Sequence, residues 1–181
     1  MKTKNSIFIG TSLDGYIADK DGGIDWLHSI PEAENVEMGY TEFTSDIDAL
    51  VMGRKTFETV LGFNIPWPYQ KPVFVLSNTL EEIPGEYNGK AHLVSGPLKD
   101  IIDHIHQQGC YKLYIDGGVT IQSFLKEDLI DEMIITTLPI LLGGGFPLFS
   151  DLKQPLRFDL LQSRIFVNAL VQSHYLRKRN Q

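Results

Sequence analysis

The sequence holds a single cysteine, Cys110, among 181 residues. One cysteine cannot form an internal disulfide, and it cannot supply the paired thiolates of a cysteine-rich zinc site. No apolar run approaches the roughly 20 residues of a membrane-spanning helix, and residues 6–10 are too short for the core of a signal peptide. These absences predict a cytoplasmic protein that contacts no membrane.

Positive charge is also scarce, because 16 Lys and Arg residues stand against 23 Asp and Glu residues, which gives a net charge of −7. A protein that binds nucleic acid nonspecifically needs a basic face for the phosphates, so we expect no nucleic-acid partner. The five histidines show no spacing typical of metal ligands. The sequence lacks the Gly-x-x-x-x-Gly-Lys-Ser/Thr motif of P-loop phosphotransferases, so neither a metal site nor that chemistry is predicted.

The hydrophobic pattern predicts an α/β fold in a single domain over residues 1–181. Buried strands are expected at residues 6–10, 49–52, 73–76, 92–94 and 112–115. Helices are expected at residues 32–44, 54–60 and 97–108, and again after residue 118. Strand-like segments at 131–138, 158–164 and 169–176 then follow with no helix between them. This order predicts a mostly parallel central sheet that ends in an antiparallel C-terminal hairpin.

Two glycine corners are the most informative motif, because each follows an apolar run and precedes a helix-like segment. Gly53 forms the first corner, and Gly117 with Gly118 forms the second. A strand that turns through glycine into a helix leaves free amides at the positive end of the helix dipole, which suits a phosphate. Arg54 and Lys55 add positive charge beside the first corner. Two corners predict a dinucleotide, provided that the amides are free and Arg54 is not held in an internal ion pair.

Several segments resemble known reductases. Residues 51–58 (Val-Met-Gly-Arg-Lys-Thr-Phe-Glu) closely resemble the adenine-nucleotide-binding segment of dihydrofolate reductases. Residues 12–18, 22–26, 116–118, 124–132 and 139–149 resemble the reductase domain of bacterial riboflavin biosynthesis and its stand-alone relatives. This ordered set covers nearly the whole chain and is more specific than any single glycine pair. The resemblance implies a three-layer, dihydrofolate reductase-like fold and NADPH-dependent reduction of a pyrimidine- or pteridine-like small heterocycle.

The resemblance also implies residues that bind NADPH. The pyrophosphate and the 2′-phosphate side would be held by Gly53, Arg54, Lys55 and Thr56. The adenosine end would be lined by Leu76, Ser77 and Asn78. The other side of the diphosphate would be approached by Gly117, Gly118, Val119 and Thr120. Near the nicotinamide and the substrate, a loop would close through Ser12, Asp14 and Ile17.

Asp14 and Glu37 are the candidate catalytic residues. Glu37 falls where dihydrofolate reductases keep the acidic residue that contacts the pterin, although riboflavin-type relatives do not rely on that carboxylate. Asp14 precedes a glycine, so a role as a turn residue is the alternative. Asp116 stands where dihydrofolate reductases usually have a small residue, which alters the charge beside the diphosphate.

Two other functions remain open at this point. One is true dihydrofolate reduction, and the other is a nucleotide-binding module without turnover, because no residue is an obligatory nucleophile or base. The deaminase that accompanies the riboflavin reductase is not expected, since its zinc site needs His-x-Glu with paired cysteines. The β-rich C-terminal segment offers a sheet edge that could pair with a second copy, as in riboflavin-type relatives, so we expect a homodimer.

Overall fold

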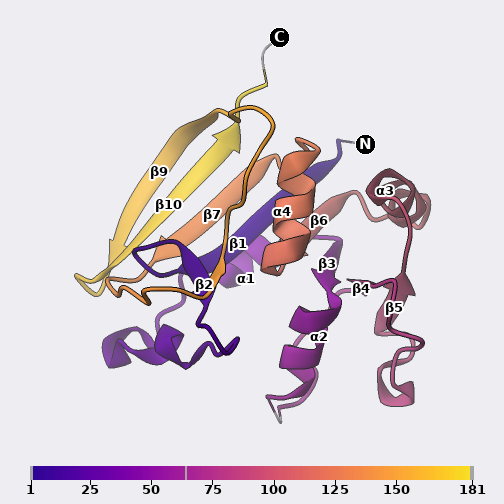
Figure 1. Cartoon of the computed structure of the whole chain (residues 1–181), viewed down its shortest axis with the longest axis horizontal. Coiled ribbons are helices and arrows are strands. Elements are labelled where there is room, and N and C mark those ends of the chain that lie inside the picture. Colours follow the sequence, from indigo (N-terminus) through magenta and orange to yellow (C-terminus); the bar gives the residue numbers. More distant parts are fainter. Residues whose placement is uncertain (1, 64, 180–181) are drawn as a thin grey trace.

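The computed structural model describes residues 2–63 and 65–179. Within these ranges one sheet has the strand order β5-β4-β3-β6-β1-β7-β10-β9 (Figure 1). Its strands are β1 (Lys4–Thr11), β3 (Ala49–Gly53), β4 (Val73–Leu76), β5 (Ala91–Val94), β6 (Lys112–Asp116), β7 (Glu132–Thr137), β9 (Phe158–Phe166) and β10 (Leu170–Arg177). The neighbours from β5 to β7 are parallel, and β10 and β9 are antiparallel. The expected parallel sheet with a C-terminal hairpin is confirmed.

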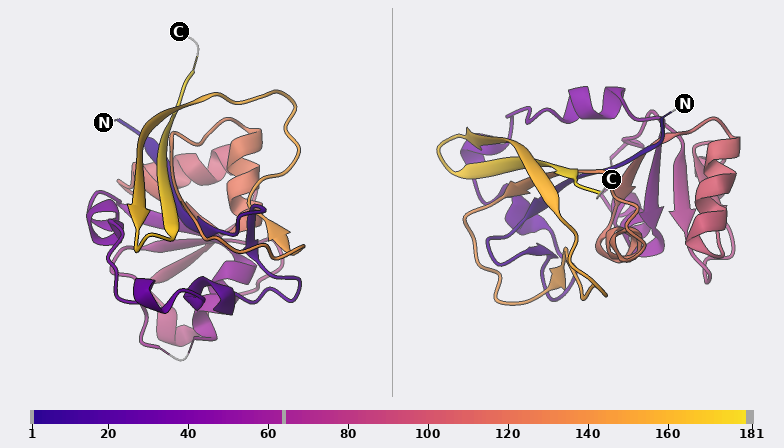
Figure 2. Two further views of the ribbon diagram at one scale, coloured as in Figure 1. Left: turned by 90° about the vertical axis from the view of Figure 1, so that its left-hand side faces the viewer. Right: turned by 90° about the horizontal axis from the view of Figure 1, so that it is seen from above.

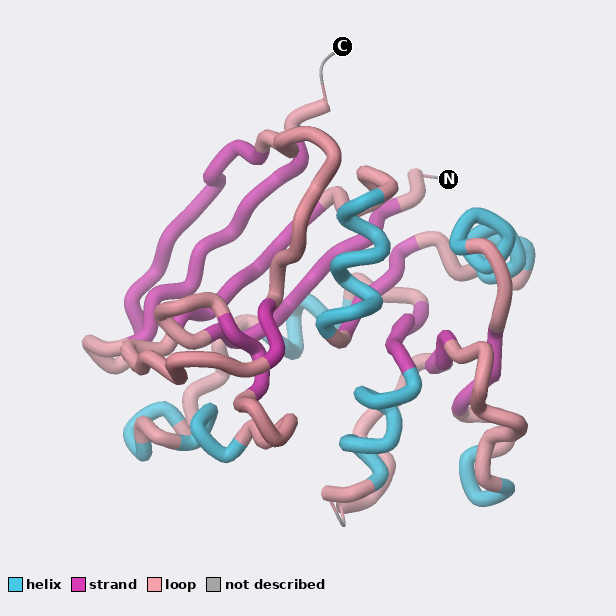
Figure 3. The backbone as a smooth tube through the Cα atoms, viewed as in Figure 1, coloured by secondary structure: helices cyan, strands magenta, loops and turns pink. Residues whose placement is uncertain are grey.

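The helices are α1 (Tyr40–Ser45), α2 (Arg54–Leu61), α3 (Leu98–Gln107) and α4 (Gly118–Lys126). Short 3₁₀ turns add η1 (Asp25–His28), η2 (Pro31–Ala33) and η3 (Gly85–Tyr87) (Figure 3). In the described part of the chain, no helix is both long and apolar enough to cross a membrane.

The expected helix over residues 32–44 is wrong. Pro31 begins only one 3₁₀ turn, and the chain then runs as a loop until α1 starts after Gly39. Gly39 has a φ of 87°, a left-handed conformation that glycine adopts freely and that ends any continuous helix. The apolar spacing across this segment therefore belongs to two separate elements.

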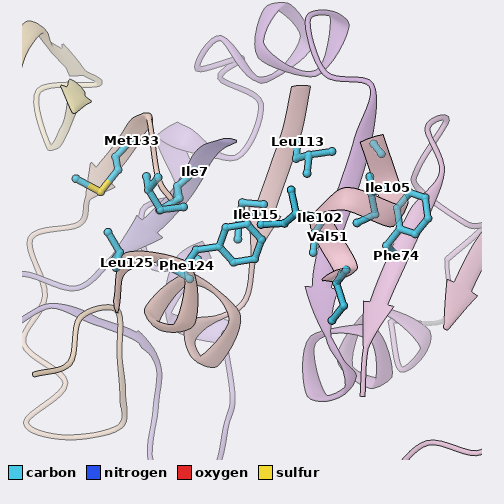
Figure 4. Packing of buried hydrophobic residues seen from close by; sticks show 14 of the residues in the cluster. Ile7, Val51, Phe74, Ile102, Ile105, Leu113, Ile115, Phe124, Leu125 and Met133 are labelled. Atoms are coloured by element: carbon cyan, nitrogen blue, oxygen red, sulfur yellow. The ribbon is translucent and has the colours of Figure 1, made fainter. Parts of the chain in front are cut away.

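Helices cover both faces of the parallel part of the sheet, as the view from above shows for α1 and α4 (Figure 2). The α3 and α4 side chains Ile102, Ile105, Phe124 and Leu125 pack in one buried cluster with Ile7, Val51, Phe74, Leu113 and Ile115 of the strands (Figure 4). Phe43 of α1 and Phe57 of α2 belong to a second cluster with Leu50 and Met52 of β3. Because both faces are covered, these strands read as continuous apolar runs.

A second, two-stranded sheet joins β2 (Tyr16–Ala18) to β8 (Phe146–Pro147), with Tyr16 opposite Pro147 and Ala18 opposite Phe146. Neither strand is expected from the sequence, because each is only two or three residues long. The pairing ties the loop after β1 to the segment that follows β7.

Candidate functional site

Both glycine corners open at the same edge of the sheet. Strands β3 and β6 are adjacent and parallel, with Met52 opposite Asp116, and each strand leads directly into a helix. Helix α2 begins at Arg54 and helix α4 begins at Gly118. The amino ends of the two helices are therefore neighbours, and both present positive dipole ends to the same region.

The two corners interlock through glycine and threonine. A Cβ on Gly117 would lie 2.2 Å from Thr56 Oγ1, and a Cβ on Gly53 would lie 2.9 Å from Thr120 Oγ1. Gly117 also has a φ of 87°, which disfavours any other residue. Thr120 is buried between the corners, whereas Val119 is 73% exposed. Glycine at positions 53 and 117 thus lets the corners approach closely.

The amides at the second corner are partly occupied. The Gly117 amide donates to Asp116 Oδ1 at 2.8 Å, so this amide is already satisfied by the protein. The amide of Ile121 donates to the Gly117 carbonyl. The amides of Gly118, Val119 and Thr120 come before this first hydrogen bond of the helix. A helix supplies no acceptor for its first amides, so an anion can bind there.

Arg54 forms an ion pair at the surface. Its Nε lies 2.7 Å from Glu58 Oε1, and its Nη1 lies 3.1 Å from Thr79 Oγ1. The side chains of Arg54 and Glu58 are 45% and 47% exposed. An exposed pair of this kind contributes about 0.3–0.5 kcal/mol, less than a charge-assisted bond to a phosphate. The pair is not internal, so Arg54 can exchange Glu58 for an anionic ligand at little cost.

The segment after β4 adjoins the first corner, since Leu76 lies opposite Gly53 in the sheet. Ser77 Oγ accepts hydrogen bonds from the amides of Thr79 at 3.1 Å and Leu80 at 2.9 Å, which folds the segment into a turn. Asn78 is exposed in that turn. The turn places Thr79 against the Arg54 side chain.

Lys55 lies on the other side of the first corner. Its Nζ is 5.4 Å from the centroid of the Phe146 ring, a distance suited to a cation–π contact. The side chain is exposed, so its charge also remains accessible to a phosphate.

The loop after β1 contacts the second corner. Ile17 Cδ1 lies 2.9 Å from the position of a Cβ on Gly118. Ser12, by contrast, is buried, and its Oγ donates to Asp14 Oδ1 at 2.6 Å and accepts from the Tyr16 amide at 2.9 Å. Ile17 therefore packs against the second corner, while the Ser12 hydroxyl is used within its own loop.

Asp14 is exposed, and its carboxylate accepts from the amides of Leu142 at 3.1 Å and Gly143 at 2.8 Å. The hydrogen bond from Ser12, together with these amides, lowers the pKa of Asp14 in spite of the opposing effect of desolvation. A carboxylate held in its ionised form is an acceptor rather than a proton donor. Its contacts support a role in loop structure.

Glu37 lies in the loop before α1 and not within a helix, which corrects the place expected for it. Its carboxylate accepts from the amides of Gly39 and Thr41, both at 2.7 Å, and so stabilises the start of α1. The Thr41 amide, followed by that of Gly39, lowers the pKa of Glu37. Both hydrogen bonds stay within its own turn, and neither reaches a glycine corner. These contacts do not support a catalytic role for Glu37.

Asp116 is the acidic group that the structure places at the corners. It ends β6 and is partly buried, and burial raises its pKa to about 6, against the opposing effect of the Gly117 amide. From the sequence, Asp116 is notable only for the charge that it places beside the expected diphosphate. An acidic residue that ends a buried apolar strand, Lys-Leu-Tyr-Ile-Asp, is a signal that could have identified it.

Three tyrosines, Tyr40, Tyr69 and Tyr114, lie within the electrostatic reach of Asp116. Burial raises the pKa of each phenol, and the charge of Asp116 raises it further. Tyr114 donates to the Phe8 carbonyl at 2.8 Å, and its ring centroid lies 6.4 Å from that of Tyr40. No local pattern predicts this cluster, because its members come from three distant segments of the chain.

The arrangement combines two neighbouring helix amino ends, which suit an anion, with a carboxyl whose pKa is raised by burial to about 6. Within residues 2–63 and 65–179, no three His, Cys, Asp or Glu side chains come together as metal ligands. The amino ends of α2 and α4 suit a phosphorylated ligand at the corners.

Comparison with known proteins identifies the family of the chain. The family described as the RibD C-terminal domain matches residues 6–171. The uncharacterized protein YwjB of Bacillus subtilis strain 168 is 34% identical over 180 residues, which cover 98% of this chain and 99% of YwjB.

Solved structures show the same fold. A candidate riboflavin biosynthesis protein from Shewanella sp. PV-4 has 56% identity and a TM-score of 0.94, with 97% of this chain and 99% of that chain covered. The deaminase/5-amino-6-(5-phosphoribosylamino)uracil reductase of Thermotoga maritima has 16% identity and a TM-score of 0.72, and the match covers 98% of this chain but 57% of that chain. Dihydrofolate reductase from Enterococcus faecalis, complexed with NADP(H), has 16% identity and a TM-score of 0.69, with 97% of each chain covered. The expected dihydrofolate reductase-like fold is confirmed.

Proposed function

The chain belongs to the RibD C-terminal domain family, and on this premise we propose that it is an NADPH-dependent reductase of a pyrimidine- or pteridine-like small molecule. The hydride would go to a C=N or C=O carbon of the substrate. The observation that carries the proposal is the interlocked pair of glycine corners, each at the start of a helix, with Arg54 beside them.

The chain's own residues would bind and orient the dinucleotide. The first-turn amides of α2 and α4 would hold the diphosphate, and Gly53 and Gly117 would keep the two corners close enough to share it. Arg54 and the turn at Ser77 would hold the 2′-phosphate and the adenosine end. When bound, the nicotinamide ring supplies the hydride.

Asp116 is the residue we assign to proton handling. Hydride addition to a polarised double bond leaves charge on the neighbouring nitrogen or oxygen, which a proton neutralises. Asp116 Oδ1 accepts the Gly117 amide, so Oδ2 is the atom that would hold this proton. A pKa of about 6 keeps part of the carboxyl protonated near neutral pH. The rings of Tyr40 and Tyr69 would exclude water from the substrate.

Arg54→Ala is expected to weaken NADPH binding about 10–100-fold and NADH binding less than about threefold, because only NADPH carries the 2′-phosphate. Isothermal titration of both dinucleotides against wild type and variant measures the difference. Equal weakening of NADPH and NADH binding would mean that Arg54 does not bind the 2′-phosphate.

Glu58→Gln is the matched control for Arg54. It breaks the surface ion pair without removing the guanidinium. NADPH should then bind as tightly as to wild type or more tightly, and a loss as large as that of Arg54→Ala would mean that the pair itself holds the site.

The C-terminal hairpin supports the proposal of a homodimer. Leu160 and Ile165 of the edge strand β9 are 57% and 71% exposed, and Val171 of β10 is 42% exposed. Ile165 pairs with Val171 and Leu160 pairs with Tyr175, so these apolar residues share one face of the hairpin. An apolar face on a sheet edge suits a second copy of the same hairpin.

Ile165→Asp is expected to convert the dimer to a monomer at micromolar concentration, because it buries a charge in the proposed interface. Light scattering measures the mass. Gln162→Asp, on the same strand but on the opposite face, should leave the dimer intact. A wild-type protein that is monomeric at that concentration would contradict the proposal.

A further inference from the structure

Asp14 connects two parts of the chain that lie far apart in sequence. Its carboxylate belongs to the loop at residues 12–18 and accepts from the amides of Leu142 and Gly143 in the segment at residues 140–148. Backbone hydrogen bonds add to this connection, because Leu13 donates to the Ile140 carbonyl and Leu148 donates to the Gly15 carbonyl. The loop and the segment therefore form one unit.

The glycines at 143–145 allow this close association. All three have a positive φ, and a Cβ on Gly145 would lie 2.1 Å from the Ala18 carbonyl oxygen. Strand β8 then pairs with β2 directly after these glycines. The glycine run at residues 143–145 is thus packed tightly against the loop after β1.

The unit rests on both glycine corners. Gln122 Nε2 of α4 donates to the Pro147 carbonyl at 2.8 Å, and Ile17 packs against Gly118. Phe146 lies beside Lys55 of α2. In the sheet order β4-β3-β6-β1, the unit follows β1 and the Ser77 turn follows β4, so they flank the corners on opposite sides (Figure 1).

We propose that Asp14 is a positioning residue, whose carboxylate fastens residues 12–18 to residues 140–148 so that the two form a fixed wall over the nicotinamide half of the dinucleotide. The adenosine half lies on the other side of the corners, beside the Ser77 turn, and does not meet this wall. The proposal rests on the proposed binding of NADPH. Asp14 acts here through the loops and not on the reacting atoms.

Asp14→Asn tests whether the Asp14 carboxylate holds residues 12–18 against residues 140–148. The amide group of asparagine keeps one acceptor oxygen and replaces the other with a donor, so one of the two contacts to Leu142 and Gly143 is lost. Hydrogen exchange of these two amides, followed by NMR, is expected to accelerate about tenfold or more. Exchange at wild-type rates would overturn the proposal, whether or not the protein binds NADPH.

The affinities for two ligands show whether Asp14 positions the wall over the nicotinamide half or only stabilises the fold as a whole. Asp14→Asn is expected to weaken NADPH about tenfold and to change the affinity of adenosine 2′,5′-bisphosphate, which carries only the adenosine half, less than about twofold. Equal weakening of both ligands would overturn the proposal. If wild type binds neither ligand, the proposed function fails, and the exchange experiment still decides the role of Asp14.

Asp19→Asn is the matched control. Asp19 lies close to Asp14 in the sequence, but its Oδ1 accepts from the nearby amides of Asp21 and Gly23, within its own loop. This variant should keep wild-type exchange at Leu142 and Gly143 and wild-type affinity for NADPH. The same losses as in Asp14→Asn would overturn the specific role of Asp14.

Discussion

Gly117→Ala is expected to lower the free energy of unfolding by about 3–5 kcal/mol and to abolish measurable NADPH binding. Two costs add up at this position. The backbone of Gly117, with φ 87° and ψ 137°, lies in a region that is nearly restricted to glycine and costs another residue about 1–3 kcal/mol. The new Cβ would also lie 2.2 Å from Thr56 Oγ1. The two corners must separate to relieve this contact, so the helix ends can no longer share one diphosphate. Urea unfolding and a titration with NADPH measure the two effects.

Gly109→Ala is the matched control for this prediction. Gly109 has a φ of 84°, but nothing lies within 4 Å of its added Cβ. This variant should lose only about 1–2 kcal/mol and keep NADPH binding. Thr56→Ala combined with Gly117→Ala should recover part of the lost stability, because it removes the hydroxyl that the Cβ meets. A loss in Gly117→Ala no larger than that in Gly109→Ala would contradict the interlocked corners.

Asp116→Asn is expected to lower turnover about 100-fold or more and to stabilise the protein at neutral pH. Burial raises the pKa of Asp116 from 3.8 to about 6, so the folded state favours the protonated carboxyl. The raised pKa contributes its full stabilisation of the folded state below pH 4, and this contribution is lost as the pH rises through 6. Asparagine does not titrate, so it avoids that loss. The variant should gain about 1–2 kcal/mol over wild type at pH 8, after allowance for partial exposure, and little at pH 4.

Urea unfolding between pH 4.5 and pH 8 and NADPH absorbance with a panel of pyrimidine and pterin acceptors test both parts. If the difference in unfolding free energy between Asp116→Asn and wild type did not grow with pH, the raised pKa of Asp116 would be contradicted. Unchanged turnover would show that water, and not Asp116, supplies the proton.

The sequence predicted the elements whose signals are local. The apolar run of β3 and the glycine that ends it are adjacent in the chain, and the same holds for β6 and Gly117. Both faces of these strands are covered by helices, which is why their residues are apolar without alternation. The order of parallel strands and the antiparallel hairpin followed from the same local patterns.

The sequence did not predict features that depend on distant pairing. The residues of β2 and β8 are about 130 positions apart, and neither strand has a pattern of its own. A helix over residues 32–44, which would include Glu37, is expected because Pro31 favours a helix start, but the left-handed backbone of Gly39 divides the segment. Asp116 acquires its raised pKa only when the fold surrounds it, and Asp14 finds Leu142 and Gly143 only when two loops meet.

A titration of the ¹⁵N-labelled protein with NADPH, followed through its backbone amide resonances, decides whether the two helix starts bind a dinucleotide. We expect saturable shifts at the amides of Arg54, Lys55, Gly118 and Val119, the first residues of α2 and α4. No shift at these amides with millimolar NADPH, or saturation at another surface alone, would contradict this expectation.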